Sequence, residues 1–186
     1  MSVFKNRRTA VIITVILCLL ALVIGVRRSV GRQAADILEQ FESGVRSSSA
    51  GYTLPSVSAQ LEARSNASLG LISLAAQYGE LSEKTDAVRR AREALLDAGS
   101  VTARSEANAA LGSACDALVP LLEQQLTDAD KISALKDYAG IMSNTARLIE
   151  TSGYNELVSD FRSNVLGLFP VNVLYRIAGV TVPDYF

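Results

Sequence analysis

The chain has 186 residues, of which 49% are apolar and 20% are charged, and it contains no histidine. This length is sufficient for one domain with a hydrophobic core, alone or together with a membrane anchor. The lack of histidine excludes Ser-His triads, histidine metal motifs and the usual general base of enzymes that work near neutral pH.

Basic and acidic residues are unevenly distributed behind a formal net charge of -1. Residues 1–32 hold six of the eighteen basic residues and none of the nineteen acidic ones, so the remainder carries a net charge of -7. An acidic soluble part argues against nucleic acid as a partner, because phosphate binding needs clustered Lys and Arg. The basic amino-terminal residues instead suit the anionic headgroups of a lipid bilayer.

A run of seventeen uncharged, mostly aliphatic residues occupies positions 10–26, between a basic segment at 1–9 and Arg27-Arg28. At about 1.5 Å per residue, a helix of this length covers roughly 25 Å, near the lower limit for crossing a bilayer. A cleaved signal peptide usually has a shorter apolar region that is followed by small residues. We therefore predict a single-pass transmembrane helix at 10–26 and localisation in the cell membrane. Three basic residues flank it on each side, so they do not determine its orientation.

Helical periodicity continues beyond the predicted span. Residues 27–56 are predicted to form a juxtamembrane helix, with Ile37, Phe41 and Val45 on one face, and then a kinked connection rich in serine. From Val57, apolar residues spaced by three and four predict a helix of about forty residues that stops near Gly99.

Two further helices are predicted in the remaining chain. The first runs from about residue 101 to 126, is capped by Ser100 or Thr102, and kinks near Pro120. The second starts at Thr127 or Asp128. Its apolar stripe changes phase after Gly153 to Leu157, Phe161, Val165 and Leu168, which predicts a local bend, and it ends before Phe169-Pro170.

These segments define an all-α fold. It consists of one N-terminal transmembrane helix followed by an antiparallel bundle of three to four long helices at 57–170 and an apolar tail at 171–186.

Residues that could carry catalysis or bind a metal are scarce. Cys115 lacks a histidine to activate it and is predicted to be a buried thiol, too far along the chain from Cys18 to pair with it. Asp128 and Asp130 lack the glycine and glutamate of a calcium loop, and a helix-cap role explains them. We therefore expect no enzymatic activity, no metal site and no cofactor.

The end of the chain resembles the signature of the LemA family of bacterial membrane-anchored helical proteins. The similarity begins with Tyr154 and Asn155 in "YNELVSDF" and continues in "FPVNVLYRIAGVTVPDYF". The matching positions there are Phe169, Pro170, Asn172, Gly179, Tyr185 and Phe186. A weaker similarity covers residues 60–79, where Ser68, Leu69 and Gly70 depart from the family's pattern, as Thr151, Ser152 and Gly153 do before Tyr154.

The resemblance implies membrane attachment and a scaffold or adaptor role in the cell envelope, with no catalytic activity. The eight matching residues become candidates for packing or partner binding. Expected partners are the lipid bilayer and a membrane or envelope protein, or a second copy of the chain. One alternative for Phe169, Tyr175, Tyr185 and Phe186 is that they only cover the open end of the bundle. Another for the whole protein is a membrane-linked sensor or signalling module that binds a ligand between its helices.

Overall fold

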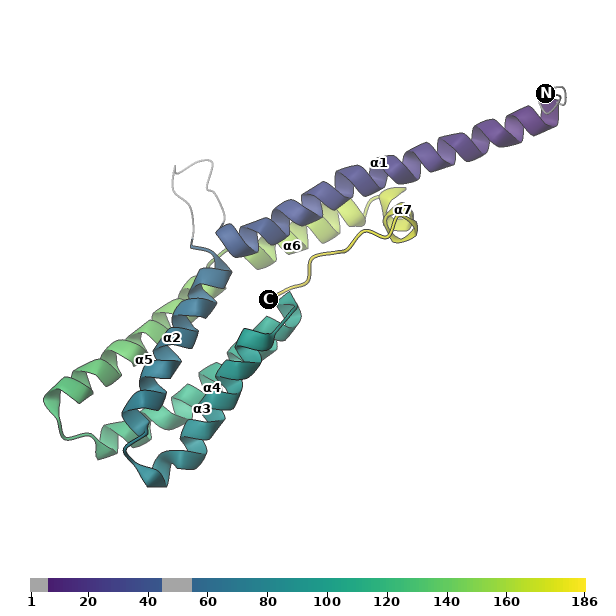
Figure 1. The fold of residues 1–186 in the computed structure, drawn as a ribbon. Helices are drawn as coiled ribbons and strands as arrows, with labels where there is room; N and C mark the ends of the chain where they lie inside the picture. Colours follow the sequence, from purple (N-terminus) through teal and green to yellow (C-terminus); the bar gives the residue numbers. More distant parts are fainter. Residues whose placement is uncertain (1–6, 45–54) are drawn as a thin grey trace. The chain divides into compact units, whose positions relative to one another are not determined.

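The computed structural model describes residues 7–44 and 55–186. These residues form helices and no strand, which confirms the predicted all-α fold (Figure 1). They divide into two compact units. Unit 1 combines Met1–Leu38 with Glu156–Pro183, and unit 2 combines Glu39–Asn155 with Asp184–Phe186. The predicted boundary at residue 170 does not coincide with this division, because residues 156–170 belong to unit 1 and the last three residues belong to unit 2.

The first helix, α1, extends without interruption over Arg7–Ser43. Within the described residues it is the one helix that is long and apolar enough to cross a membrane, by length and composition. Large aliphatic side chains of the apolar run are exposed, from 50% at Ile16 to 64% at Ile24. Val45 and most of the predicted kinked connection lie outside the described residues.

Unit 2 is a bundle of four helices that alternate in direction (Figure 1). They are α2 (Val57–Ala75), α3 (Ser82–Asp97), α4 (Val101–Gln125) and α5 (Ala129–Glu150). α2 packs mainly on α5, and α3 packs mainly on α4. The predicted apolar stripes form the core, in which Leu71, Val88, Leu111, Leu118, Leu122 and Leu135 are almost fully buried.

The prediction of one helix of about forty residues after Val57 is wrong. α2 ends at Ala75, Tyr78 is extended, and a short 3-10 turn, η2 (Gly79–Leu81), leads into α3. Gly79 begins this turn, and glycine is less favourable in a helix than alanine by about 1 kcal/mol. The reversal lets α2 and α3 pack against each other. Both halves of the predicted stripe are thereby buried, whereas a straight helix of that length would leave one half without a neighbour.

Helix starts follow the predicted capping residues. Ser100 Oγ accepts a hydrogen bond of 3.2 Å from the Ala103 amide, and Asp128 accepts from the Asp130 and Lys131 amides. Before α2, Ser56 accepts from the Ala59 amide at 3.0 Å. α4 remains helical through Pro120, and α3 ends at Asp97, two residues before the predicted glycine stop.

The predicted fourth helix does not continue to Phe169, because the chain leaves the α-helix near Gly153, where the local bend was predicted. α5 stops at Glu150, Gly153 has φ of +77°, and α6 (Tyr154–Phe161) begins at the next residue. A φ in this region is favourable for glycine and costly for residues with a Cβ.

The carboxyl-terminal part of unit 1 runs from α6 through a π-helical turn, η3 (Arg162–Leu166), to α7 (Val171–Ile177). α7 was not predicted. Nor does the predicted stripe of Val165 and Leu168 hold, because a π turn contains an extra residue and shifts the phase. Leu166 is buried instead, and Leu168 is 57% exposed.

α6 and η3 lie antiparallel beside α1 within unit 1 (Figure 1). The two segments line a common groove of about 310 Å³, to which α1 contributes Gln33, Asp36 and Ile37. Its opposite wall consists of Leu157, Asp160, Phe161, Asn164 and Val165.

Candidate functional site

The last residues of the chain are held by the start of α6 within unit 2. The Asn155 side chain donates a hydrogen bond to the Phe186 carbonyl and accepts one from the Phe186 amide, both at 2.9 Å. The Tyr154 hydroxyl donates to the Asp184 carbonyl at 3.0 Å. We name this arrangement, together with Phe41, the carboxyl-terminal clasp.

Aromatic contacts complete the clasp. The Phe41 ring lies edge-on to Tyr154 at 5.1 Å between centroids, and 5.7 Å from the Phe186 ring. Phe41 and Tyr154 are each 1% exposed. The Arg104 guanidinium lies 5.7 Å from the Phe41 centroid and donates to Glu42 at 2.7 Å. The hydrogen bond from Ser58 and, to a smaller extent, the hydrogen bond from Arg104 lower the pKa of Glu42. The clasp therefore combines an aromatic cluster with hydrogen bonds to main-chain atoms.

Two features of unit 1 precede the clasp along the chain. α7 ends in a Schellman motif, in which Gly179 has φ of +64° and the Val180 amide donates to the Tyr175 carbonyl at 3.1 Å. The Arg162 guanidinium then donates two hydrogen bonds, of 3.3 and 2.8 Å, to the Pro183 carbonyl. Pro183 is almost fully buried. Gly179 thus reverses the chain, and Arg162 fixes the point to which the chain returns.

The predicted candidate residues do not form one site. Tyr154, Asn155 and Phe186 meet in the clasp, and Tyr185 between its backbone contacts is 44% exposed. The other four belong to unit 1: Phe169, Pro170, Asn172 and Gly179. The Phe169–Pro170 peptide bond is cis. The interpretation that these aromatics cover the end of the bundle is wrong for Phe169, which is 84% exposed.

Two residues of these contacts were not predicted as site residues. Phe41 was assigned only to an apolar helix face, since nothing local reveals a ring partner more than a hundred residues away. Arg162 carried no recognisable pattern, because its acceptor is a backbone carbonyl. A backbone acceptor has no sequence signature.

A second site lies among α2, α4 and α5, around Arg64. This residue is 4% exposed, and its Nη1 donates to the Met142 carbonyl at 2.6 Å. Its Nε is buried without a hydrogen-bond partner among the described residues. Desolvation lowers the pKa of Arg64. A buried guanidinium without a paired anion is costly, because burial removes the water that solvates its charge.

Arg64 lines a cavity of about 530 Å³. Asp116, Glu123 and Ser143 contribute further polar groups to its wall. A Cβ placed on Gly112 would lie 3.0 Å from Arg64 Nη2, so this glycine leaves room for the guanidinium. Cys115 also lines the cavity, is 1% exposed as predicted, and has a pKa raised to about 11 by burial. The thiol is therefore protonated and unreactive at neutral pH.

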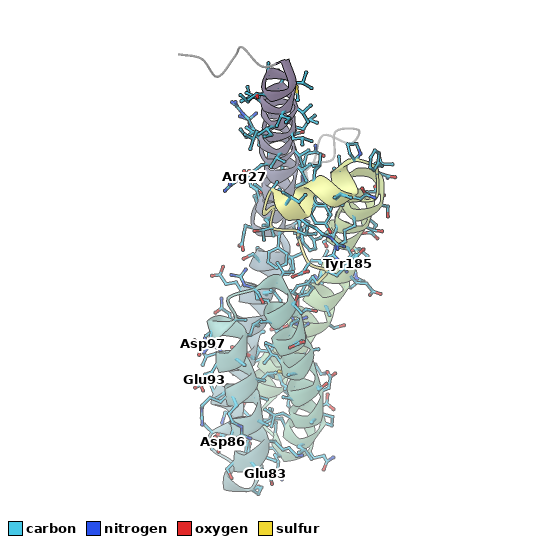
Figure 2. The ribbon with its side chains drawn as sticks, turned by 90° about the vertical axis from the view of Figure 1, so that its right-hand side faces the viewer. Arg27, Glu83, Asp86, Glu93, Asp97 and Tyr185 are labelled. Atoms are coloured by element: carbon cyan, nitrogen blue, oxygen red, sulfur yellow. The ribbon has the colours of Figure 1, made fainter. Side chains whose placement is uncertain are left out.

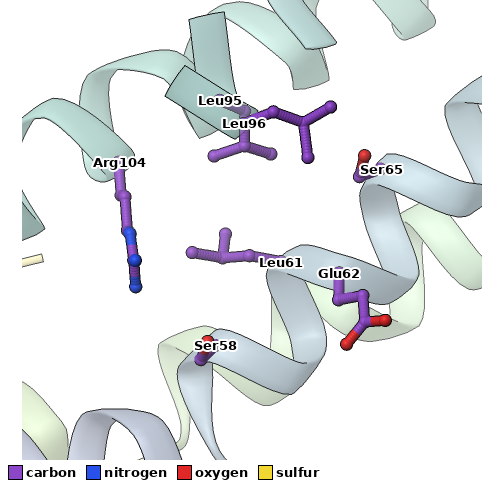
Figure 3. Close-up of a pocket in the computed structure, with 7 residues that line it drawn as sticks. All are labelled: Ser58, Leu61, Glu62, Ser65, Leu95, Leu96 and Arg104. Carbon is purple, nitrogen blue, oxygen red and sulfur yellow. The ribbon is translucent and has the colours of Figure 1, made fainter. Parts of the chain in front are cut away.

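A smaller pocket of about 160 Å³ lies between α2, the end of α3 and the start of α4. Figure 3 shows Leu61 facing Leu95 and Leu96 across this pocket, with Arg104 at one side. Its remaining wall comes from Ser58, Glu62 and Ser65. The pocket is thus a shallow depression with leucines on both walls and polar side chains around them.

No group of three or more His, Cys, Asp or Glu side chains in the described parts of the chain is arranged to hold a metal ion. The chain matches no protein-family model, no curated protein and no solved structure.

Proposed function

We propose that this protein is a single-pass, membrane-anchored scaffold or adaptor of the bacterial cell envelope, similar to LemA proteins and without enzymatic activity. One observation carries the proposal. A helix long and apolar enough to cross a bilayer, with its aliphatic side chains exposed, continues to Ser43 and is followed by a four-helix bundle. Exposed aliphatic side chains along such a run are costly in water and favourable in lipid.

The clasp supports the assignment of an interaction role to the tail. It holds Asp184 and Phe186 by backbone and ring contacts while the intervening Tyr185 is 44% exposed. A tyrosine presented on an immobilised backbone binds partners at low entropic cost, because the ordering has already occurred on folding.

The membrane anchor is tested by extraction. Cell membranes containing the full chain are washed at alkaline pH, and the chain should remain with the bilayer until detergent is added. Mass spectrometry should recover peptides from residues 1–26 in the same pool. Release by alkali, or loss of residues before Arg27 from the mature protein, would contradict the anchor and support a cleaved signal peptide.

The adaptor role is tested by photocrosslinking in native membranes. A photoreactive amino acid replaces Tyr185, and the same group replaces the exposed Leu96 of α3 as a matched control. We expect a discrete protein adduct from position 185 that position 96 does not give. Only intramolecular or lipid adducts at position 185 would argue against a protein partner.

A second function, a ligand-binding sensor, is favoured by the Arg64 cavity. Arg64 offers an unpaired guanidinium nitrogen, and Asp116 and Glu123 offer carboxylates on the same wall. These groups complement a small zwitterion, whose anionic group would pair with the guanidinium and whose cationic group would pair with a carboxylate.

The sensor function is tested by calorimetric titration of the full chain in detergent with a free amino acid, a simple carboxylate and a simple amine. The zwitterion should bind most tightly. Gly112→Ala should weaken binding by crowding the guanidinium, whereas Gly140→Ala, on α5 with open space around it, should not. Absence of binding by all three probes, or equal binding by both variants, would reject this function.

A further inference from the structure

We propose that α7 and the turn before it form a second membrane contact, an apolar ridge that lies in the headgroup region beside the point where α1 leaves the bilayer. The ridge consists of Leu168, Phe169, Val173 and Ile177. This inference rests on the proposed membrane anchor and adds a second contact to it.

The ridge is apolar and exposed. Phe169 is 84% exposed, Ile177 is 67% exposed, and Leu168 and Val173 are each more than half exposed. Val173 and Ile177 lie four residues apart on one face of α7. Phe169 precedes this helix in the turn at the cis Phe169–Pro170 bond. Large apolar side chains gathered on one exposed face mark an interaction surface.

The same part of the chain has a charge pattern that suits anionic headgroups. Residues 161–183 contain Arg162 and Arg176 but no Asp or Glu, and residues 1–35 also lack acidic residues. Arg176 Nε donates to the Tyr175 hydroxyl at 3.1 Å, and its guanidinium lies 5.7 Å from that ring's centroid. Tyrosine and arginine are typical of the membrane-water interface.

The position of α7 within unit 1 indicates that the lipid bilayer is what the ridge contacts. α6 and η3 run antiparallel to α1, and their far end, with Asn164 and Val165, lines the same groove as Gln33. Continuing past Val165 therefore leads back along α1 toward the end of the apolar run. Figure 2 shows α7 beside α1 at about the height of Arg27, the first charged residue after that run.

The ridge is also held in place. The hydrogen bonds from Arg162 to the Pro183 carbonyl join the two ends of the segment that contains it. Gly179 ends α7 by a Schellman motif, so the helix cannot extend and carry the ridge away from α1. An amphipathic helix fixed next to a membrane span needs little further ordering to enter the interface.

The test uses the absence of tryptophan from the chain. Three full-length variants carry one tryptophan each, Phe169→Trp in the ridge, Leu17→Trp in the apolar run and Leu96→Trp in the bundle. They are reconstituted in vesicles of phosphatidylcholine and phosphatidylglycerol that contain lipids brominated at different depths. Fluorescence emission and bromine quenching report whether each tryptophan touches lipid, and at what depth.

We expect blue-shifted emission of Phe169→Trp with quenching strongest by shallow bromines, deep quenching of Leu17→Trp and no quenching of Leu96→Trp. Removing phosphatidylglycerol should lower the quenching at position 169 but not at position 17. Position 169 unquenched beside a deeply quenched position 17 would overturn the ridge. A blue shift without bromine quenching would overturn it in favour of self-association. An unquenched position 17 would instead overturn the membrane anchor itself.

Discussion

At the scale of single residues, the Asn155 side-chain amide pairs with a backbone N–H and C=O in the way that a neighbouring β-strand would. Asn155 offers one donor and one acceptor, and both are used by the Phe186 backbone at 2.9 Å. The geometry orients Phe186 so that its ring reaches Phe41. Each hydrogen bond at an exposed residue contributes only about 1 kcal/mol to stability. The larger contribution therefore comes from the Phe186 ring, which excludes water from Phe41.

The two phenylalanines of the tail give a matched pair of substitutions. Phe186→Ala should lower the free energy of unfolding of the bundle by about 1–3 kcal/mol, because it removes a partly buried ring from Phe41. Phe169→Ala should change it by less than about 0.5 kcal/mol, since its ring is exposed. Chemical denaturation in detergent, followed by circular dichroism, measures both. Equal losses would contradict the assignment of Phe186 alone to the bundle.

The Cys115 thiol should titrate far above neutral pH. Its pKa is raised to about 11 because burial disfavours the thiolate. In a Cys18→Ser variant, alkylation by iodoacetamide should be slow at pH 8 and rise about tenfold per pH unit toward pH 11. The neutral thiol also stabilises the fold below its ordinary pKa, and this contribution falls as pH rises toward 11. Rapid labelling of folded protein at pH 8 would contradict a buried thiol.

At the scale of helices, apolar periodicity predicts where helices occur better than it predicts where they end and which face is buried. Apolar residues spaced by three and four along α4 and α5 face the core, where Leu118 and Leu135 are almost fully buried. The same spacing continues from α2 into α3, so periodicity alone does not reveal the reversal between Ala75 and Ser82. The π turn of η3 likewise changes which residue of the stripe is buried.

Alanine substitutions of Gly140 and Gly153 should change the stability of the protein in opposite directions. Neither Cβ would meet an atom within 4 Å, so only backbone effects differ. Gly153→Ala should destabilise by about 1 kcal/mol, because its φ is +77°. Gly140→Ala lies inside α5 and should stabilise by about 0.5–1 kcal/mol, because alanine is the better helix former. Thermal unfolding of both variants decides the signs, and destabilisation by Gly140→Ala would be the unexpected result.

At the scale of the whole molecule, the carboxyl-terminal tail is divided between the two units. Residues up to Pro183 belong to unit 1, and Asp184–Phe186 belong to unit 2. Only the last three residues of the predicted tail therefore belong to the same unit as the bundle.

Deletions of different length test this division. Removing residues 184–186 should raise amide hydrogen exchange in α2 to α5 as much as removing residues 171–186, because residues 171–183 contribute to unit 1 only. Mass spectrometry of peptides from each helix measures the exchange. If only the longer deletion affected these helices, α7 would have to be part of the bundle's support.

The sequence by itself determined the helical class, the apolar run and the burial of Cys115, and it limited the caps of α4 and α5 to two residues each, of which the structure selects Ser100 and Asp128. These features depend on local spacing and on side chains that act within a few residues of themselves. The tertiary structure alone decided that Phe186 meets Phe41, that Arg64 is buried beside Met142, and that Phe169 is exposed. Such facts depend on contacts between segments far apart in the chain, and on backbone carbonyls that every residue possesses.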